Sequence, residues 1–181
     1  EMPGPAIGNC RSYGDACLND GGHAVKMTRL DRMMGFGAET GILNVEAGMQ
    51  VGEIARLFAP QGWLPAVMPG TGFATVGGCI ANDVHGKNHH HSGNFGHHVQ
   101  AFELERSDGS SLICSSTTNP EWFSATIGGL GLTGMIKWAE VQLKAISNSS
   151  IDVKNIRFEN LKEFFEISEK VEKDYEYTVA W

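Results

Sequence analysis

The sequence lacks long apolar runs, clustered positive charge and paired cysteines. No apolar run approaches the roughly 18 residues of a membrane-spanning helix, so we predict no transmembrane segment, although peripheral membrane association is left open. Lys and Arg total 14 against 21 Asp and Glu, for a net charge of −7. A nucleic-acid surface needs clustered basic residues, so nucleic acid is not an expected partner. The 4 cysteines form no CxxC pair and no signal peptide is recognisable, so we predict no disulfide framework. The expected location is the reducing cytoplasm.

Glycine, in contrast, is abundant, and its distribution divides the chain. There are 23 glycines in 181 residues, and none from residue 135 onward, where charged residues become frequent. A chain of this length holds one domain, or one domain and a piece of another. We therefore predict one domain over residues 1–146 and the beginning of a second, truncated domain over residues 147–181.

Hydrophobic periodicity predicts mixed helices and strands in both parts. A helical stripe starts at Val51 and ends before Pro60, because proline and the following Gly62 stop a helix. Asp108-Gly109 predicts a hairpin turn between two strands. The predicted strands are Ala24–Met27, Ile42–Glu46, Val99–Leu104, Leu112–Cys114 and Met135–Leu143, with a short helix from Pro120 to Ala125. Beyond residue 147 the pattern predicts a strand Ile151–Phe158, a helix Leu161–Val171 and a strand Tyr175–Trp181.

Three glycine clusters could each hold a phosphate group. They are Gly8–Asp15, Pro69–Gly78 and Gly128–Gly134. Glycine lets backbone N–H groups approach an anion without obstruction by a side chain. None of the clusters fits the GxxxxGK[ST] P-loop or a GxGxxG between a strand and a helix, so neither an ATPase nor an NAD-binding Rossmann domain is supported. Tight turns without a ligand are the alternative for any single cluster.

The segment Asn82–His98 contains 6 of the 7 histidines. Imidazole is a common metal ligand, but there is no HExxH spacing and the cysteines are distant in the sequence. Interleaved glycines indicate an irregular loop. We therefore predict no metal site and favour a loop that folds over a cofactor, with a polar surface loop as the alternative.

Taken together, these motifs are similar in order and spacing to the vanillyl-alcohol-oxidase type (PCMH type) of FAD-binding domain. The set most resembles the FAD-linked oxidoreductases like decaprenylphosphoryl-β-D-ribose oxidase, over roughly residues 6–145, and Tyr177–Trp181 resembles an early part of that family's substrate domain. The resemblance implies an α+β FAD-binding domain of two subdomains with the pyrophosphate between them, followed by the start of an α+β substrate domain. It also implies that the N-terminal part of the domain over residues 1–146, a helix and a strand before the first glycine loop, is missing.

The resemblance also assigns site residues. It implies that His85 and Lys87 lie at the flavin ring and act in catalysis, with His85 facing the substrate. The implied cofactor-binding residues are Arg11, Ser12, Tyr13, Gly14, Gly70, Thr75, Val76, Gly77, Gly78, His85, Gly86, Lys87, Asn88 and Ile136. Many relatives attach FAD covalently through a histidine in the first loop, where this chain has Arg11, so the resemblance implies non-covalent FAD. Cys10 stands where a glycine is usual, and we interpret it as a small buried residue rather than an attachment site.

The implied activity is that of an FAD-dependent oxidase or dehydrogenase acting on CH–OH groups. Hydride would pass from a carbinol carbon of a small sugar, sugar-alcohol or sugar-lactone substrate to flavin N5. The alternative is a flavin-binding module that works with a separate substrate subunit. We expect the chain alone to be inactive, because the substrate domain is barely entered. The oligomeric state does not follow from the sequence.

Overall fold

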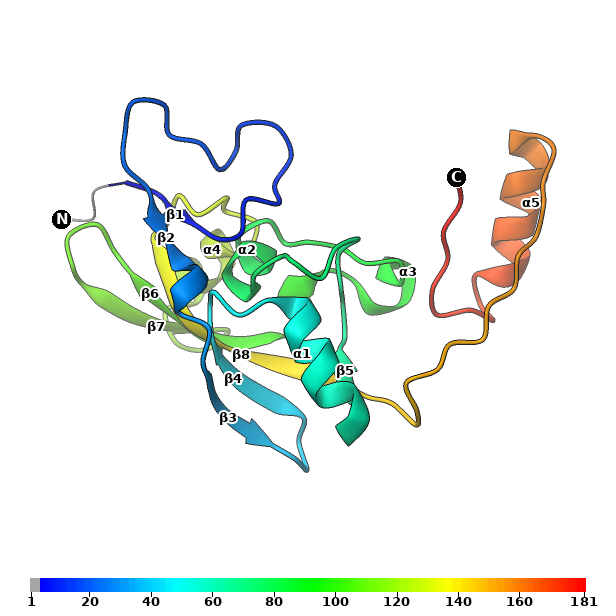
Figure 1. Ribbon diagram of the computed structural model, residues 1–181, viewed down its shortest axis with the longest axis horizontal. Helices are drawn as coiled ribbons and strands as arrows, with labels where there is room; N and C mark the ends of the chain where they lie inside the picture. The colour runs from blue at the N-terminus through cyan, green and yellow to red at the C-terminus, as the bar shows by residue number, and fades with distance from the viewer. Residues whose placement is uncertain (1–3) are drawn as a thin grey trace.

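Strand β8 (Met135–Ala145) is the centre of the fold, because it pairs with three other strands. The computed structural model describes residues 4–181. Its main sheet is antiparallel, with strands in the order β3 (Met33–Gly37), β4 (Ile42–Glu46), β8, β6 (Val99–Glu105) and β7 (Ser111–Ser115), and with β5 (Trp63–Pro65) pairing the end of β8 (Figure 1). Ala139, Val141 and Leu143 are buried at alternate positions of β8, as a strand with one covered face requires.

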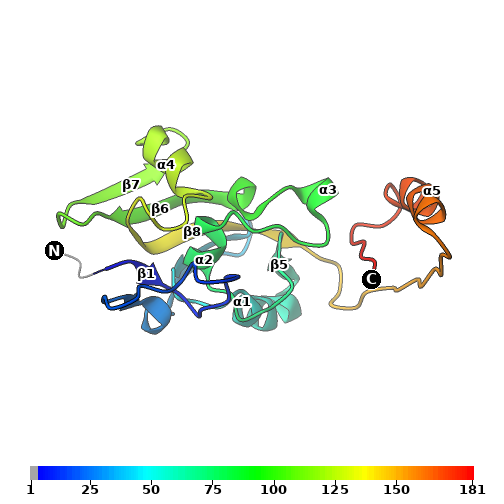
Figure 2. The ribbon, with the colours of Figure 1, turned by 90° about the horizontal axis from the view of Figure 1, so that it is seen from above.

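Helices cover both faces of this sheet. Helices α1 (Val51–Phe58) and α2 (Val76–Ala81) lie on one side and α4 (Pro120–Thr126) on the other (Figure 2). On α1 the buried residues are Val51, Ile54 and Phe58, the stripe that the sequence predicts. On the opposite side Phe123 of α4 stacks on Phe102 of β6, with ring centroids 5.2 Å apart. The predicted α+β fold class is therefore confirmed.

Short elements complete the domain. Strands β1 (Ala6–Ile7) and β2 (Val25–Lys26) pair in parallel, and single 3-10 turns occupy Met27–Arg29 and Ala59–Gln61. The predicted strand Ala24–Met27 is thus shorter than expected. The histidine-rich segment holds a short helix α3 (His89–Ser92) and a 3-10 turn (Phe95–His98), so it is more regular than predicted.

The part of the chain after β8 differs most from the sequence-based prediction. Helix α5 (Leu161–Val171) forms as expected, and Asn160 caps it by accepting from the Glu163 amide at 3.0 Å. The predicted strands Ile151–Phe158 and Tyr175–Trp181 are wrong, because both segments are extended but pair with no strand among residues 4–181. No residue of α5 is buried, and the helix stands apart from the sheet (Figure 1).

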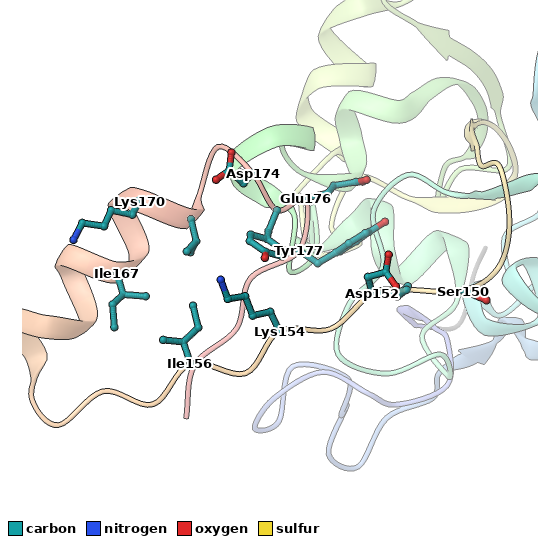
Figure 3. Close-up of a pocket in the computed structure, with 12 residues that line it drawn as sticks. Ser150, Asp152, Lys154, Ile156, Ile167, Lys170, Asp174, Glu176 and Tyr177 are labelled. Carbon is teal, nitrogen blue, oxygen red and sulfur yellow. The ribbon is translucent and has the colours of Figure 1, made fainter.

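A hollow of about 840 Å³ separates α5 from the extended segment 150–156 and from residues 174–177 (Figure 3). Ile156 and Ile167 line it, but no side chain of the segment 150–156 or of α5 is fully buried. This part of the chain therefore has little core of its own. Among residues 4–181 no helix is long and apolar enough to cross a membrane.

Candidate functional site

The second glycine loop, Pro69–Gly78, lies against the start of α1. The amide of Val51 donates to Ala74 O at 2.9 Å, and the amide of Gly52 donates to Gly72 O at 2.8 Å. The two backbones are so close that a Cβ on Gly72 would lie 3.0 Å from the Cα of Gly52. Glycine is required at both positions for this approach. The loop is therefore held rigidly from one side.

Free amide donors in this loop lie before Val76. Val76 N–H donates to Met49 O and Gly77 N–H to Ala47 O, both at 2.8 Å, while Gly78 N–H donates to the Thr75 hydroxyl at 3.3 Å. These three amides shape the loop and are already engaged. The amides of residues 70–72, 74 and 75 donate to no acceptor among residues 4–181. A Cβ on Gly70 would meet no atom within 4 Å, so this stretch has both the donors and the space that a phosphate group needs.

The first glycine loop, Gly8–Asp15, packs against the second. Asn9 Nδ2 donates to Phe73 O at 3.1 Å, and the Arg11 guanidinium lies over the Phe73 ring, 5.3 Å from its centroid. A Cβ on Gly8 would come within 2.3 Å of the Thr75 hydroxyl. The structure therefore brings Arg11 to the second loop.

The tip of the first loop is exposed. Ser12, Tyr13 and Gly14 lie on the surface, and the Tyr13 side chain is 99% exposed. Cys10 is also exposed, which corrects the interpretation that it is a small buried residue: the loop projects outward and no part of residues 4–181 covers it. The φ angle of Cys10 is 51°, in the left-handed region that favours glycine. This conformation gives a physical reason for the glycine that the resemblance leads us to expect at this position.

The third glycine loop, Gly128–Gly134, closes over the end of α2. Gly128 N–H donates to Ile80 O at 3.0 Å, and Leu130 N–H donates to Ala81 O at 2.8 Å. Arg106 holds the far end of the loop by donating to Thr133 O while its guanidinium stacks on Trp122 at 4.1 Å. A hollow of about 330 Å³ lies between this loop and the start of β1. The Ile136 side chain, in contrast, is buried in the core on β8.

The histidine loop, residues 82–98, is closed by Asp83. Its carboxylate accepts from the Gly96 amide at 2.9 Å and from Asn94 Nδ2 at 3.1 Å, and His85 pairs with Asn94 in an isolated bridge. A Cβ on Gly86 would lie 2.8 Å from Met68 O, directly before the second glycine loop. The histidine loop and the second glycine loop therefore lie side by side.

Side chains of the histidine loop alternate between solvent and interior. His85 and Lys87 are exposed, whereas Asn88 is fully buried. Asn88 Nδ2 donates to Ala66 O at 2.9 Å and to Ser92 Oγ at 3.0 Å, and its Oδ1 has no partner within the described chain. A cofactor beside this loop would meet the side chains of His85 and Lys87, but only the backbone of Asn88.

Three other histidines, His90, His91 and His98, lie within hydrogen-bond distance of backbone carbonyls, whereas His97 Nδ1 accepts from the Asn94 amide at 3.1 Å. His91 Nε2 lies 2.8 Å from Glu172 O, and His98 Nε2 lies 2.9 Å from Ser92 O. Across residues 4–181 no group of three or more His, Cys, Asp or Glu side chains is placed to hold a metal ion.

Sequence reasoning missed Asn9 and Phe73, which join the first two loops. A weak signal was present, since a large apolar side chain such as Phe73 within a glycine-rich loop is unusual. It also missed Lys144 and Glu176, whose ion pair joins β8 to the C-terminal residues. No local pattern indicates a contact across 32 positions.

The sequence matches the family described as FAD binding domain over residues 2–115. It is 36% identical, over 97% of this chain and 39% of the relative, to decaprenylphosphoryl-β-D-ribose oxidase of Mycolicibacterium smegmatis. It is 31% identical to the Δ(24)-sterol reductase of Homo sapiens, over 56% of this chain and 20% of the relative. D-lactate dehydrogenase of Anaerostipes hadrus is 26% identical over 83% of this chain and 32% of its own length. The chain thus spans less than half of each relative. It belongs to the FAD binding domain family of FAD-linked oxidoreductases, and its cofactor is FAD.

Proposed function

We propose that this chain is the cofactor-binding part of an FAD-dependent enzyme that oxidises a carbinol carbon of a sugar, sugar-alcohol or sugar-lactone substrate. The observation that carries the proposal is the position of the histidine loop beside the second glycine loop, where Gly86 contacts Met68. The identity of 36% with a sugar-phosphoryl oxidase over nearly the whole chain supports the substrate class. When bound, FAD supplies an acceptor for hydride at its N5 atom.

The glycine loops bind the cofactor in this proposal. The free amides that begin at Gly70 donate to the pyrophosphate, and Arg11 adds a positive charge from the neighbouring loop. The Thr75 hydroxyl and the amides of Val76, Gly77 and Gly78 keep the loop in shape, because all of them are engaged within the protein.

Lys87 and His85 act on the reaction in this proposal. An exposed ammonium group at a fixed backbone position stabilises negative charge that develops beside it in a reaction. The imidazole ring of His85 can donate or accept a hydrogen bond, and we assign it to contact with the substrate. In this proposal, the base that removes the hydroxyl proton of the substrate, and most other groups that contact the substrate, lie in parts of the protein outside this chain.

Attachment of FAD is non-covalent in this proposal. Arg11 carries no group that bonds to the flavin, and four free thiols support a reducing compartment such as the cytoplasm. Acid precipitation of the purified protein should release all of its flavin into the supernatant. Flavin that stays with the precipitate would contradict non-covalent attachment and point to Cys10.

Anaerobic mixing of the full-length protein with substrates tests the reaction. Loss of the oxidised flavin bands should follow addition of a sugar, sugar alcohol or sugar lactone. Lys87→Ala should slow flavin reduction about ten- to hundredfold, whereas Lys170→Ala, at an exposed lysine of α5, should not. An unchanged rate constant in Lys87→Ala removes this residue from the mechanism.

The alternative is a flavin-binding module that needs a separate substrate subunit. Contacts of residues 172–178 with the histidine loop support a continuous chain instead. A purified protein that holds FAD but is reduced by no sugar, alcohol or lactone would favour the alternative. Reduction by D-lactate alone would replace the sugar with a hydroxy acid.

A further inference from the structure

The segment Glu172–Thr178, here called the C-terminal strap, is bound along the histidine loop. Thr178 N–H donates to Lys87 O at 3.0 Å. His91 Nε2 lies 2.8 Å from Glu172 O, and His90 Nε2 lies 3.4 Å from Tyr175 O. The backbone of the strap therefore contacts the loop at three points, one of which is the backbone of Lys87 itself.

Glu176 is the centre of this contact. Its carboxylate accepts from Asn88 Nδ2 at 3.3 Å and pairs with the Lys144 ammonium, which also donates to the Tyr177 hydroxyl at 3.0 Å. Glu176 and Tyr177 extend from the strap toward the body of the domain, away from α5 (Figure 3). Glu176 thus connects the strap to the end of β8 and to the interior of the histidine loop.

The electrostatics of this contact favour the charged forms. Partial burial alone would raise the pKa of Glu176, but the Lys144 ammonium and the Asn88 amide stabilise the carboxylate and its pKa is lowered. Burial alone would lower the pKa of Lys144, and its bonds to Glu176 and Tyr177 raise it instead. The side chains are 28% exposed for Lys144 and 40% for Glu176, so water screens the pair only in part.

We propose that Glu176 is a positioning residue for Lys87. By holding Asn88 in its buried position, Glu176 fixes the backbone of the neighbouring residue whose cation acts on the reaction. The role of Lys87 in this inference rests on the proposed function, whereas the contact between Glu176 and Asn88 is independent of it. Without the carboxylate, Asn88 loses one of its three acceptors and the Lys144 ammonium loses its counter-charge.

The test uses the full-length protein with Glu176→Met and, separately, Lys144→Met. Met is about as long as Glu, but it neither accepts from Asn88 nor neutralises the ammonium. Glu169→Met on the exposed part of α5 is the matched control, because the Glu169 side chain makes no ion pair or hydrogen bond within residues 4–181. Two quantities are measured: hydrogen exchange of the amides of residues 86–93, and the rate constant of flavin reduction at full FAD occupancy and saturating substrate.

We expect amide exchange to rise roughly three- to tenfold in both variants, and not in the control. The reduction rate constant should fall roughly three- to tenfold in the same two variants, because small displacements of a catalytic group are costly. A double variant should be no worse than either single one, since both remove the same contact.

Three results would overturn the inference. Unchanged exchange in both variants means that Glu176 does not hold the loop, and the proposed function is unaffected. Faster exchange with an unchanged reduction rate means that the contact is purely structural. An equal rise in exchange in Glu169→Met means that the effect is not local. Failure of the proposed function is recognised separately, by an unchanged reduction rate in Lys87→Ala.

Discussion

Replacing Gly70 with alanine should change stability and FAD affinity in opposite directions. A Cβ at this position meets no atom within 4 Å and the φ angle is not in the left-handed region, so the folded protein accepts alanine without strain. Alanine also restricts the unfolded chain, which stabilises a protein by about 0.4–1 kcal/mol at a compatible site. Gly70→Ala should therefore leave the FAD-free protein equally stable or slightly more stable.

FAD affinity should fall, because the empty space beside Gly70 is the space that we assign to the pyrophosphate. A methyl group there keeps the phosphate from the free amides of the loop, at a cost of about 1.4–2.8 kcal/mol, or roughly ten- to hundredfold in Kd. Urea unfolding of the FAD-free protein gives the stability, and isothermal titration with FAD gives the affinity.

Two further variants separate these effects. Gly35→Ala on β3 also meets no atom within 4 Å, but lies away from the glycine loops, so its FAD affinity should match the wild type. Gly8→Ala places a Cβ 2.3 Å from the buried Thr75 hydroxyl, so both stability and affinity should fall. An unchanged Kd for FAD in Gly70→Ala would refute the assignment of the pyrophosphate to this loop.

Three other predictions concern the domain as a whole. The buried Glu46 carboxylate accepts hydrogen bonds from the Arg32 backbone amide at 2.8 Å and from the Arg32 guanidinium at 2.6 and 3.1 Å. Glu46→Gln should therefore lower the free energy of unfolding by about 1–3 kcal/mol at pH 7. Arg32 lowers the pKa of Glu46 in the folded state. The stability that Glu46 contributes is therefore fully present above its pKa in the unfolded chain, and it is lost as the pH falls through its pKa in the folded protein. If the difference in unfolding free energy between wild type and Glu46→Gln, measured with urea, does not shrink in acid, this explanation is contradicted. Burial raises the pKa of Cys79 to about 12, so iodoacetamide should label the exposed Cys10 in the native protein and leave Cys79 unmodified, as mass spectrometry of tryptic peptides can check. Phe102→Ala should cost about 3–5 kcal/mol of unfolding free energy, and a thermal midpoint equal to that of the wild type would argue against its place in the core.

The elements that could be predicted from the sequence are those whose own residues determine them. Helix α1 has a continuous apolar stripe from Val51 to Phe58 and a proline after it, and the structure forms it with these bounds. Strand β3 was missed, since its sequence Met-Met-Gly-Phe-Gly has no alternation. It forms because β4 supplies hydrogen bonds and because Phe36 packs on Phe58 at 4.5 Å.

The reverse error concerns residues 151–158, where alternation predicted a strand. Alternation describes two faces of an extended chain, but a strand also needs a partner, and none is present among residues 4–181. The candidate site shows the same limit. Its glycine clusters are visible in the sequence, but the engaged amides of Val76 and Gly77 depend on carbonyls almost 30 positions earlier. Which donors remain free for a ligand is therefore a property of the fold.

The central place of β8 determines the order in which the domain can assemble. Strands β3–β4 and β6–β7 are local hairpins that can close soon after synthesis, but each joins the sheet only through β8, the last of these strands to leave the ribosome. Until residue 145 is available, the hairpins expose unpaired edges, and α2 lacks the strand against which it packs. The growing chain should therefore be most prone to aggregation, and most dependent on chaperones, before residue 145 emerges, and FAD should be acquired only after that point.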